Sequence, residues 1–229
     1  MHKRIVIIGA SRGIGAEIVK ILAKNSDFEI LALSRDLDKM ELVFKEYPNV
    51  QSFYFDLKSN IKEQLDYILK NYSTIDILIN NAGYLVNKPF PLLTHDDFNE
   101  SYQINTIGVM ESVQNIIPKM HENGGHIINI SSMGGVQGTM KFAGLAAYST
   151  SKAALCSFTE LFAEEYKDTK IKMNCLALGA AQTEMLEEAF PGYKAPISAA
   201  QMAEYITEFA LQGDQWFNGK ILPVSLSTP

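Results

Sequence analysis

The residues of this chain best suited to acid–base chemistry are Tyr148 and Lys152, four positions apart in AAYSTSK. On a helix, residues four apart share one face and lie one turn from each other. A lysine ammonium at that distance favours the phenolate and lowers the pKa of the tyrosine. Such a tyrosine can act as a general acid or base near neutral pH. Ser132, in ISSMGG, could hydrogen-bond the same substrate oxygen. The Tyr-x-x-x-Lys spacing alone also occurs by chance in many helices.

A glycine-rich stretch, RIVIIGASRGIG, supplies a second element with chemical meaning. Residues 5–8 are apolar and β-branched, and they predict a short strand buried on both faces. Gly9, Gly13 and Gly15 follow directly, and an amphipathic segment begins where they end. A strand, a glycine turn and a helix start can hold a phosphate against backbone N–H groups. The spacing G-x-x-x-G-x-G differs from the common G-x-G-x-x-G fingerprint, and such glycines can also form only a tight connection.

Two arginines indicate which dinucleotide the turn would bind. The second predicted strand ends in Ser34, and Arg35 follows it, while Arg12 lies inside the glycine turn. An acidic residue at this strand end would bind the ribose 2′-hydroxyl of NAD. Two guanidinium groups instead suit a 2′-phosphate, which favours NADP(H) over NAD(H). Alternatively, the two arginines could be solvated side chains on the surface. Asp36 could also pair with Arg35 or accept a hydrogen bond from a ribose, which leaves NAD possible.

Polar side chains also follow the later strands. Asp56 and Leu57 could hydrogen-bond and pack against an adenine, or Asp56 could serve only a turn. The segment Asn80-Asn81-Ala82-Gly83 could brace the sheet and leave room for a flat ligand, although Asn-rich turns are common. Asn105 falls within a predicted helix, where asparagine is a poor helix former. A buried amide at this position needs hydrogen-bond partners, and it could serve the site or be only a satisfied amide of the core.

Strand-like and helical patterns alternate along the chain, which predicts an α/β fold with a doubly wound, mostly parallel sheet. Strands are expected over 5–8, 28–33, 50–55, 75–79, 126–130, 171–177 and 221–224. Helices are expected over 13–25, 37–46, 61–71, from Thr94 to about Gly124-Gly125, over 147–166, and after Ser198. Asp97 and Gln201 are placed for capping boxes with Thr94 and Ser198. Ligands on such sheets bind beyond the carboxyl ends of the strands.

Length and composition restrict the classes of function. The 229 residues predict a single domain over 1–229, and the net charge of −6 disfavours nucleic acid and anionic membranes as partners. The sequence lacks a stretch approaching the ~20 apolar residues of a membrane helix. Cys156 and Cys175 are expected to be buried thiols and, with no secretion signal, we expect a cytoplasmic protein. We expect no metal site.

Taken together, these residues resemble the short-chain dehydrogenase/reductase family, including its 3-oxoacyl-ACP-reductase-like members. The resemblance covers nearly the whole chain. It rests on GASRGIG, SRD, DL, NNAG, the asparagine of QINTIG, INISS, YSTSK and LGAAQTEM, in this order and at these separations.

The resemblance implies one Rossmann-like sheet of about seven strands that binds NAD(P). Tyr148 would protonate the substrate carbonyl oxygen as hydride arrives, Ser132 would hold that oxygen, and Lys152 would bind the nicotinamide ribose and depress the pKa of Tyr148. Asn105 would fix a water that links Lys152 to solvent. The implied cofactor-binding residues are Gly9, Ser11, Arg12, Gly13, Ile14, Gly15, Ser34, Arg35, Asp56, Leu57, Asn81, Ala82, Gly83, Tyr148, Lys152, Gly179, Ala181 and Thr183.

The sequence departs from the family pattern where substrate and neighbouring subunits would bind. Leu178 replaces a usual proline, the segment after Thr183 is short, and Ser225-Leu226-Ser227-Thr228 stands where the family usually has Gly-Gly. The resemblance implies NADPH-dependent reduction of a ketone, aldehyde or 3-oxoacyl group, or the reverse oxidation, by a homodimer or homotetramer. The alternative is a non-catalytic NADP(H) sensor of the same fold. Substrate selection would lie in residues 85–93, 133–146 and 185–195.

Overall fold

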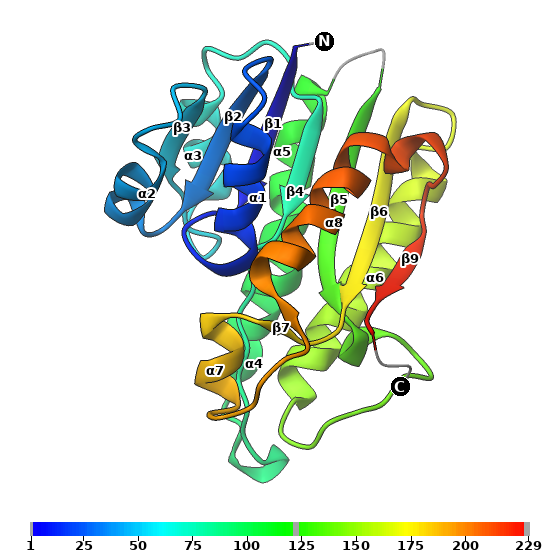
Figure 1. The fold of residues 1–229 in the computed structure, drawn as a ribbon. Helices are drawn as coiled ribbons and strands as arrows, with labels where there is room; N and C mark the ends of the chain where they lie inside the picture. The colour runs from blue at the N-terminus through cyan, green and yellow to red at the C-terminus, as the bar shows by residue number, and fades with distance from the viewer. Residues whose placement is uncertain (1, 121–123, 227–229) are drawn as a thin grey trace.

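Seven parallel strands form the central sheet of the computed structural model, which describes residues 2–120 and 124–226 (Figure 1). The sheet order reverses between β1 and β4, which makes this pair the switch point where ligands bind on doubly wound sheets. The predicted α/β fold is confirmed. In sheet order the strands are β3 (Val50–Tyr54), β2 (Phe28–Ser34), β1 (Lys3–Ile8), β4 (Ile77–Asn80), β5 (Gly125–Ser132), β6 (Ile171–Leu178) and β9 (Ile221–Val224).

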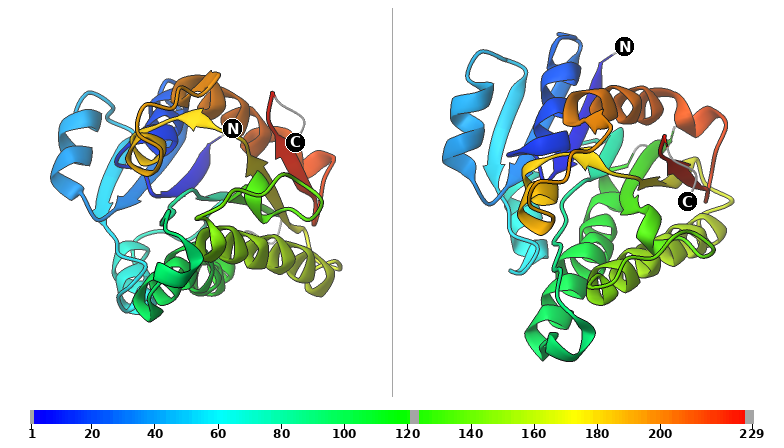
Figure 2. Two further views of the ribbon diagram at one scale, coloured as in Figure 1. Left: turned by 90° about the horizontal axis from the view of Figure 1, so that it is seen from below. Right: turned by 60° about the horizontal axis from the view of Figure 1, so that its bottom comes forward.

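Helices cover both faces of the sheet and make three layers (Figure 2). One layer contains α1 (Gly13–Ala23), α2 (Leu37–Phe44) and α8 (Ala199–Gln212), and the other contains α3 (Ile61–Ile68), α5 (Gly108–Ile116) and α6 (Ala146–Glu165). Successive strand residues point to opposite faces. Ile5 and Ile7 of β1 therefore join the first core, and Val6 and Ile8 join the second. The strand is buried on both faces, as its apolar run predicts.

The long helix expected from Thr94 to Gly124-Gly125 is interrupted, so this prediction is wrong in its extent. The structure has α4 (His95–Tyr102), the π-helical turn η2 (Gln103–Ile107), α5, and the 3-10 turn η3 (Ile117–Lys119). Pro118 within η3 has no backbone N–H to continue the helical ladder. Single π-helical turns inside helices occur frequently at functional sites.

Several short elements at the carboxyl ends of the strands carry no clear sequence signal. They are η1 (Phe90–Leu92), η4 (Met133–Gly135), the strand pair β7 (Ala181–Gln182) and β8 (Ile197–Ser198), α7 (Glu184–Ala189) and, beside α8, η5 (Gly213–Gln215). Figure 1 shows α7 below the carboxyl ends of the strands. Both predicted capping boxes are present at α4 and α8. The predicted C-terminal departure at Ser227-Thr228 lies outside the described residues.

Candidate active site

A cavity of about 540 Å³ opens at the carboxyl ends of the strands, on both sides of the switch point. Its size is in the range of small-molecule sites. All but two of the predicted site residues line it, and the exceptions are Gly15 and Asn105. The predicted residues that line it are Gly9, Ser11, Arg12, Gly13, Ile14, Ser34, Arg35, Asp56, Leu57, Asn81, Ala82, Gly83, Ser132, Tyr148, Lys152, Gly179, Ala181 and Thr183.

The glycine turn has the backbone that its sequence predicts. Gly9 and Gly13 have positive φ angles of 90° and 55°, which L side chains rarely adopt. A Cβ on Gly9 would lie 2.5 Å from the backbone nitrogen of Ala82. A Cβ on Gly15 would overlap the carbonyl oxygen of Gly9, so Gly15 is needed where α1 packs against the end of β1. Gly15 therefore permits close packing and does not contact the cavity.

Helix α1 starts at the edge of this cavity without a side-chain cap. Its N-cap residue, Arg12, makes no capping hydrogen bond, and no acidic residue lies in the first turn. The N-termini of α2, α3, α4, α7 and α8 each have a side-chain cap. The first backbone N–H groups of a helix need acceptors and favour negative charge. This end of α1 therefore fits a phosphate group.

Two amides brace the strands beneath the cavity, which is one of the two alternatives that their sequence left open. Asn80 donates from Nδ2 to Oδ1 of Asn129 at 2.8 Å, which links β4 to β5. Asn81 donates from Nδ2 to the carbonyl oxygen of Gly9 at 2.9 Å, which links the end of β4 to the glycine turn. Ala82 and Gly83 follow and line the cavity with small residues. The floor of the site is therefore fixed by the sheet.

Tyr148 and Ser132 face the same cavity from α6 and β5. The Ser132 hydroxyl oxygen accepts a hydrogen bond from the Gly134 backbone at 3.2 Å and caps η4. Burial raises the pKa of Tyr148 above its usual value, and a hydrogen bond with Ser132 opposes that rise in part. The expectation that Lys152 lowers the pKa of Tyr148 is not met here, because desolvation disfavours the phenolate and the lysine is directed elsewhere.

Lys152 is 3% exposed, and its Nζ donates to the carbonyl oxygen of Ile130 at 2.8 Å. Burial lowers the pKa of Lys152 to about 8, and the thiols of Cys175 and Cys156 oppose the shift. Desolvation penalises the ammonium form more than these neighbours stabilise it. Lys152 is therefore an amine whose charge changes near physiological pH.

Asn105 lies in the π-helical turn η2 and is completely buried. Its Oδ1 accepts from the Tyr84 backbone N–H at 2.8 Å, and its Nδ2 donates to the Tyr84 carbonyl at 2.9 Å and to Oγ of Ser151 at 2.9 Å. The amide thus has the partners that a buried polar group needs. It joins the segment after β4 to α6 at Ser151, which is three residues after Tyr148 and next to Lys152.

The two arginines have different surroundings. Arg12 is held by Glu188 of α7, with Nη1 to Oε1 at 2.5 Å and Nη2 to Oε2 at 3.2 Å. This hydrogen bond raises the pKa of Arg12 and lowers the pKa of Glu188. Arg35 is exposed at the cavity edge. Asp36 accepts from the Lys39 backbone N–H and caps α2, so its carboxylate already has a structural partner.

The remaining predicted positions complete the walls. Ser34 donates its hydroxyl to Ser11 at 2.9 Å, and Asp56 accepts from the Lys58 backbone at 3.0 Å. Thr183 caps α7 by accepting from the Leu186 backbone at 3.2 Å. A Cβ on Gly179 would collide with the Ser225 side chain, so only glycine fits there.

Sequence reasoning missed individual residues of the cavity although it located their segments. Tyr84, Ile104, Ser131 and Glu184 line the cavity from positions next to predicted site residues. The three segments expected to select substrate contribute further side chains, which are Leu85, Met133, Gly134, Phe142, Leu145, Met185, Leu186, Phe190 and Tyr193. Loop conformation decides which side chains turn inward, and hydrophobic periodicity does not specify it.

Cys156 and Cys175 are buried free thiols with Sγ atoms 3.9 Å apart, as predicted for thiols in a helix and a strand. Within residues 2–120 and 124–226, no group of three or more His, Cys, Asp or Glu side chains is placed to hold a metal ion. In the same residues, no helix is long and apolar enough to cross a membrane.

Comparison with known proteins agrees with this geometry. Residues 3–194 match the family model for short chain dehydrogenase. A 3-oxoacyl-[acyl-carrier-protein] reductase FabG from Chlamydia pneumoniae is 29% identical, over 91% of this chain and 88% of the relative. Carbonyl reductase family member 4 from Xenopus tropicalis is 28% identical, over 81% of this chain and 78% of the relative.

A solved structure of ElxO with NADP bound superposes with a TM-score of 0.85 at 25% identity, over 98% of this chain and 97% of that one. The family model covers most of the chain, including the glycine turn and the Tyr148–Lys152 pair. The chain therefore belongs to the short-chain dehydrogenase family of NAD(P)-dependent oxidoreductases.

Proposed function

We propose that this protein is an NADPH-dependent carbonyl reductase that converts a ketone, an aldehyde or a 3-oxoacyl group to an alcohol, or catalyses the reverse reaction. One observation carries the proposal: Tyr148, Ser132 and Lys152 line the same cavity as the phosphate-fitting glycine turn. The uncapped start of α1 and the small residues after β4 fit a dinucleotide laid across the carboxyl ends of the strands.

In the proposed reaction, bound NADPH supplies the hydride. The Tyr148 hydroxyl donates a proton to the carbonyl oxygen, and the Ser132 hydroxyl hydrogen-bonds that oxygen. Because burial raises the pKa of Tyr148, the phenol is protonated at neutral pH. A protonated phenol is the form that a reductase needs, since general acid catalysis requires the proton on the donor.

Lys152 and Asn105 would act beside Tyr148. A Cβ on Gly83 would lie 3.6 Å from Lys152 Nζ and 3.5 Å from Asn105 Oδ1, so both polar groups approach this small residue. We assign Lys152 to the nicotinamide ribose. Asn105 has used both Nδ2 hydrogens in hydrogen bonds, and the free lone pair of its Oδ1 would accept from a water that links Lys152 to solvent.

NADP(H) is favoured over NAD(H) because Arg12 and Arg35 both line the cavity where β2 ends. A guanidinium group binds a 2′-phosphate by charge-assisted, bidentate hydrogen bonds. Asp36, the acidic residue that follows Arg35 in the sequence, caps α2. The structure of ElxO with NADP bound supports the same assignment.

Replacing Glu188 by glutamine is expected to strengthen NADPH binding about threefold to tenfold. Glu188 occupies both Nη atoms of Arg12, and a 2′-phosphate would have to displace this carboxylate. Since the ion pair is exposed, the competition is modest. The measurement is the Kd of NADPH and of NADH by fluorescence titration. NADH binding should not change, and Glu187→Gln, which removes a charge from the same helix away from Arg12, is the matched control. Unchanged NADPH binding in Glu188→Gln would contradict the competition.

The kcat/KM of carbonyl reduction is expected to fall as the pH rises through about 8. The pKa of Lys152 is lowered to about 8, so its ammonium form is present below that pH and is lost above it. The raised pKa of Tyr148 keeps the phenol protonated over the same range. A profile of kcat/KM for NADPH between pH 6 and 10 tests this, because that parameter reports the enzyme without bound cofactor. If kcat/KM stays constant up to pH 9.5, the charge of Lys152 does not control the reaction rate.

The decisive test of the proposed function is a panel of ketones, aldehydes and 3-oxoacyl thioesters, followed by NADPH absorbance with NADH in parallel. Oxidation of NADPH that depends on a carbonyl compound supports the reductase. Tight NADPH binding without turnover across the panel, together with a bound protein partner, would support the NADP(H) sensor instead.

We further propose a homo-oligomer formed through the helices that carry Asn105 and Tyr148. Ile107, Met110 and Leu161 are large apolar side chains exposed on these elements, with exposed fractions of 43%, 36% and 67%. Contiguous exposed apolar patches often mark protein–protein contacts, and these three side chains would contribute to such a patch. The free thiols of Cys156 and Cys175 fit a reducing compartment such as the cytoplasm.

A further inference from the structure

The part of the cavity beyond Tyr148 is apolar. Three segments, residues 84–93, 133–146 and 185–195, form it and are called the substrate loops below. Their cavity-lining side chains include Leu85, Met133, Phe142, Leu145, Met185 and Phe190. Among the described residues, none of the charged side chains that line the cavity belongs to these loops. Tyr84 and Tyr193 add hydroxyl groups to the lining.

The charged lining residues lie at the other end or beside Tyr148. Arg12 lies in the glycine turn, and Arg35 and Asp56 follow β2 and β3, where the adenosine half would bind. Glu184 is also near the glycine turn, because its Oε2 lies 3.4 Å from the position of a Cβ on Gly13. Lys152 donates to the Ile130 carbonyl beneath the cavity floor. An anionic group on the substrate would therefore meet no cation on the substrate loops.

The lysines of the substrate loops do not line the cavity, and two of them are bound to other groups. Lys88 donates to both carboxylate oxygens of Asp97, each at 2.8 Å. Lys141 donates to the Val136 carbonyl and to the Thr139 hydroxyl. Lys194 is exposed on the outer surface beside Tyr193. Burying a carboxylate or phosphate without a paired cation is strongly unfavourable.

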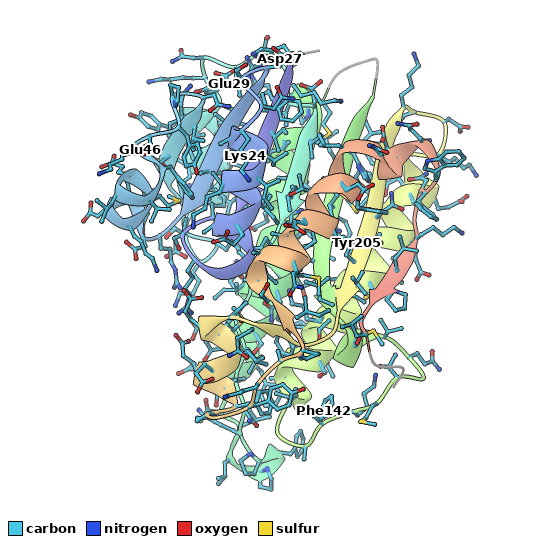
Figure 3. All side chains as sticks on the ribbon, in the orientation of Figure 1. Lys24, Asp27, Glu29, Glu46, Phe142 and Tyr205 are labelled. Carbon is cyan, nitrogen blue, oxygen red and sulfur yellow. The ribbon has the colours of Figure 1, made fainter. Side chains whose placement is uncertain are left out.

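The substrate loops hold one another in place. Asn87 donates from Nδ2 to the Ala189 carbonyl at 3.0 Å, which ties the first loop to the third. The Lys88 backbone N–H donates to the Gly144 carbonyl at 3.0 Å, which ties the first loop to the second. Figure 3 shows Phe142 at the lower end of the molecule, below the carboxyl ends of the strands. Phe142 lines the cavity and is still 57% exposed, so a substrate can cover more of its ring.

We propose that the substrate is an uncharged carbonyl compound with an aliphatic or aromatic body, and not a keto acid or a phosphorylated ketone. This inference rests on the proposed carbonyl reductase activity and specifies its substrate class. The substrate loops bind the apolar body by burying it, and Tyr148 and Ser132 hold the carbonyl oxygen. Selection against anions follows from the lack of a counter-charge on the substrate loops.

The test compares methyl 6-oxoheptanoate with 6-oxoheptanoate, which match in chain length and differ in charge. With NADPH saturating, kcat/KM is expected to be about 100-fold higher for the ester, since the acid must bury an unpaired carboxylate. Across 2-butanone, 2-hexanone and 2-octanone, kcat/KM should rise roughly fourfold per methylene. Equal values for ester and acid overturn this inference alone. No NADPH oxidation with any carbonyl compound overturns the proposed function, and the inference with it.

A charge placed on the apolar wall gives a second readout. In Phe142→Lys the preference for the ester is expected to shrink by about tenfold, because the new ammonium offers the carboxylate a partner. Leu42→Lys is the matched control, since Leu42 is also exposed, at 69%, and lies on α2 away from the cavity. Its preference for the ester should equal that of the unchanged protein. A preference that is the same in both variants places the substrate elsewhere and overturns the inference.

Discussion

Replacing Tyr148 by phenylalanine is expected to lower kcat for carbonyl reduction by about 10³-fold, within the usual range for the loss of a general acid. The substitution removes the hydroxyl and keeps the ring, so the cavity wall retains its shape. Developing charge on the carbonyl oxygen then loses its proton donor, and the Ser132 hydroxyl can offer only a hydrogen bond. Stopped-flow measurement of NADPH oxidation in a single turnover would isolate this step from product release.

The same variant should bind NADPH with a Kd within a few-fold of the unchanged protein. The phosphate-fitting turn and the arginines are on β1, α1 and the end of β2, far along the chain from α6. Tyr205→Phe serves as the control, because Tyr205 is a partly exposed tyrosine on α8 that does not line the cavity (Figure 3). Substantial activity of Tyr148→Phe on a genuine substrate would disprove the proton-donor role.

The direction of the Tyr148 pKa shift could not be predicted from the spacing of Tyr148 and Lys152 alone. The i, i+4 spacing correctly places Tyr148 and Lys152 on one helix that borders the cavity. Spacing does not say where the ammonium points, and here it donates to the Ile130 carbonyl. In the structure described here, burial decides the direction.

The strands and the order of the site motifs could be predicted because their physical signals are local. A short β-branched run followed by glycines specifies a buried strand and its turn. The contacts that also require glycine at positions 9 and 15 come partly from Ala82 and Asn81, after β4. The interruption at Asn105 could not be predicted in the same way. The π-helical turn places that amide against Tyr84 and Ser151, which are distant in sequence.

The contact between Arg12 and Glu188 likewise depends on tertiary structure. The two residues are 176 positions apart. Helix α7, which carries Glu188, is short and has little apolar periodicity by which the sequence could reveal it. Its charge indicated Arg12 as a phosphate ligand. The charge did not indicate that a carboxylate, that of Glu188, already binds the Arg12 guanidinium group. The contact makes the two arginines unequal. Within the described part of the chain, Arg35 has no carboxylate bound to it, whereas Arg12 must first release one.

Arg35→Ala is therefore expected to weaken NADPH binding by about 10-fold to 100-fold, since charge-assisted hydrogen bonds to phosphate are among the stronger ones. NADH lacks the 2′-phosphate, and its Kd should change by less than about twofold. Lys39→Ala controls for the loss of one positive charge near the same site, because Lys39 is exposed on α2 and does not line the cavity. Titration of both cofactors against both variants provides the comparison. Equal weakening of NADPH and NADH binding would mean that Arg35 contacts a part common to both cofactors. The preference for NADPH would then have to come from Arg12 alone. Arg12 would have to supply it in competition with the Glu188 carboxylate.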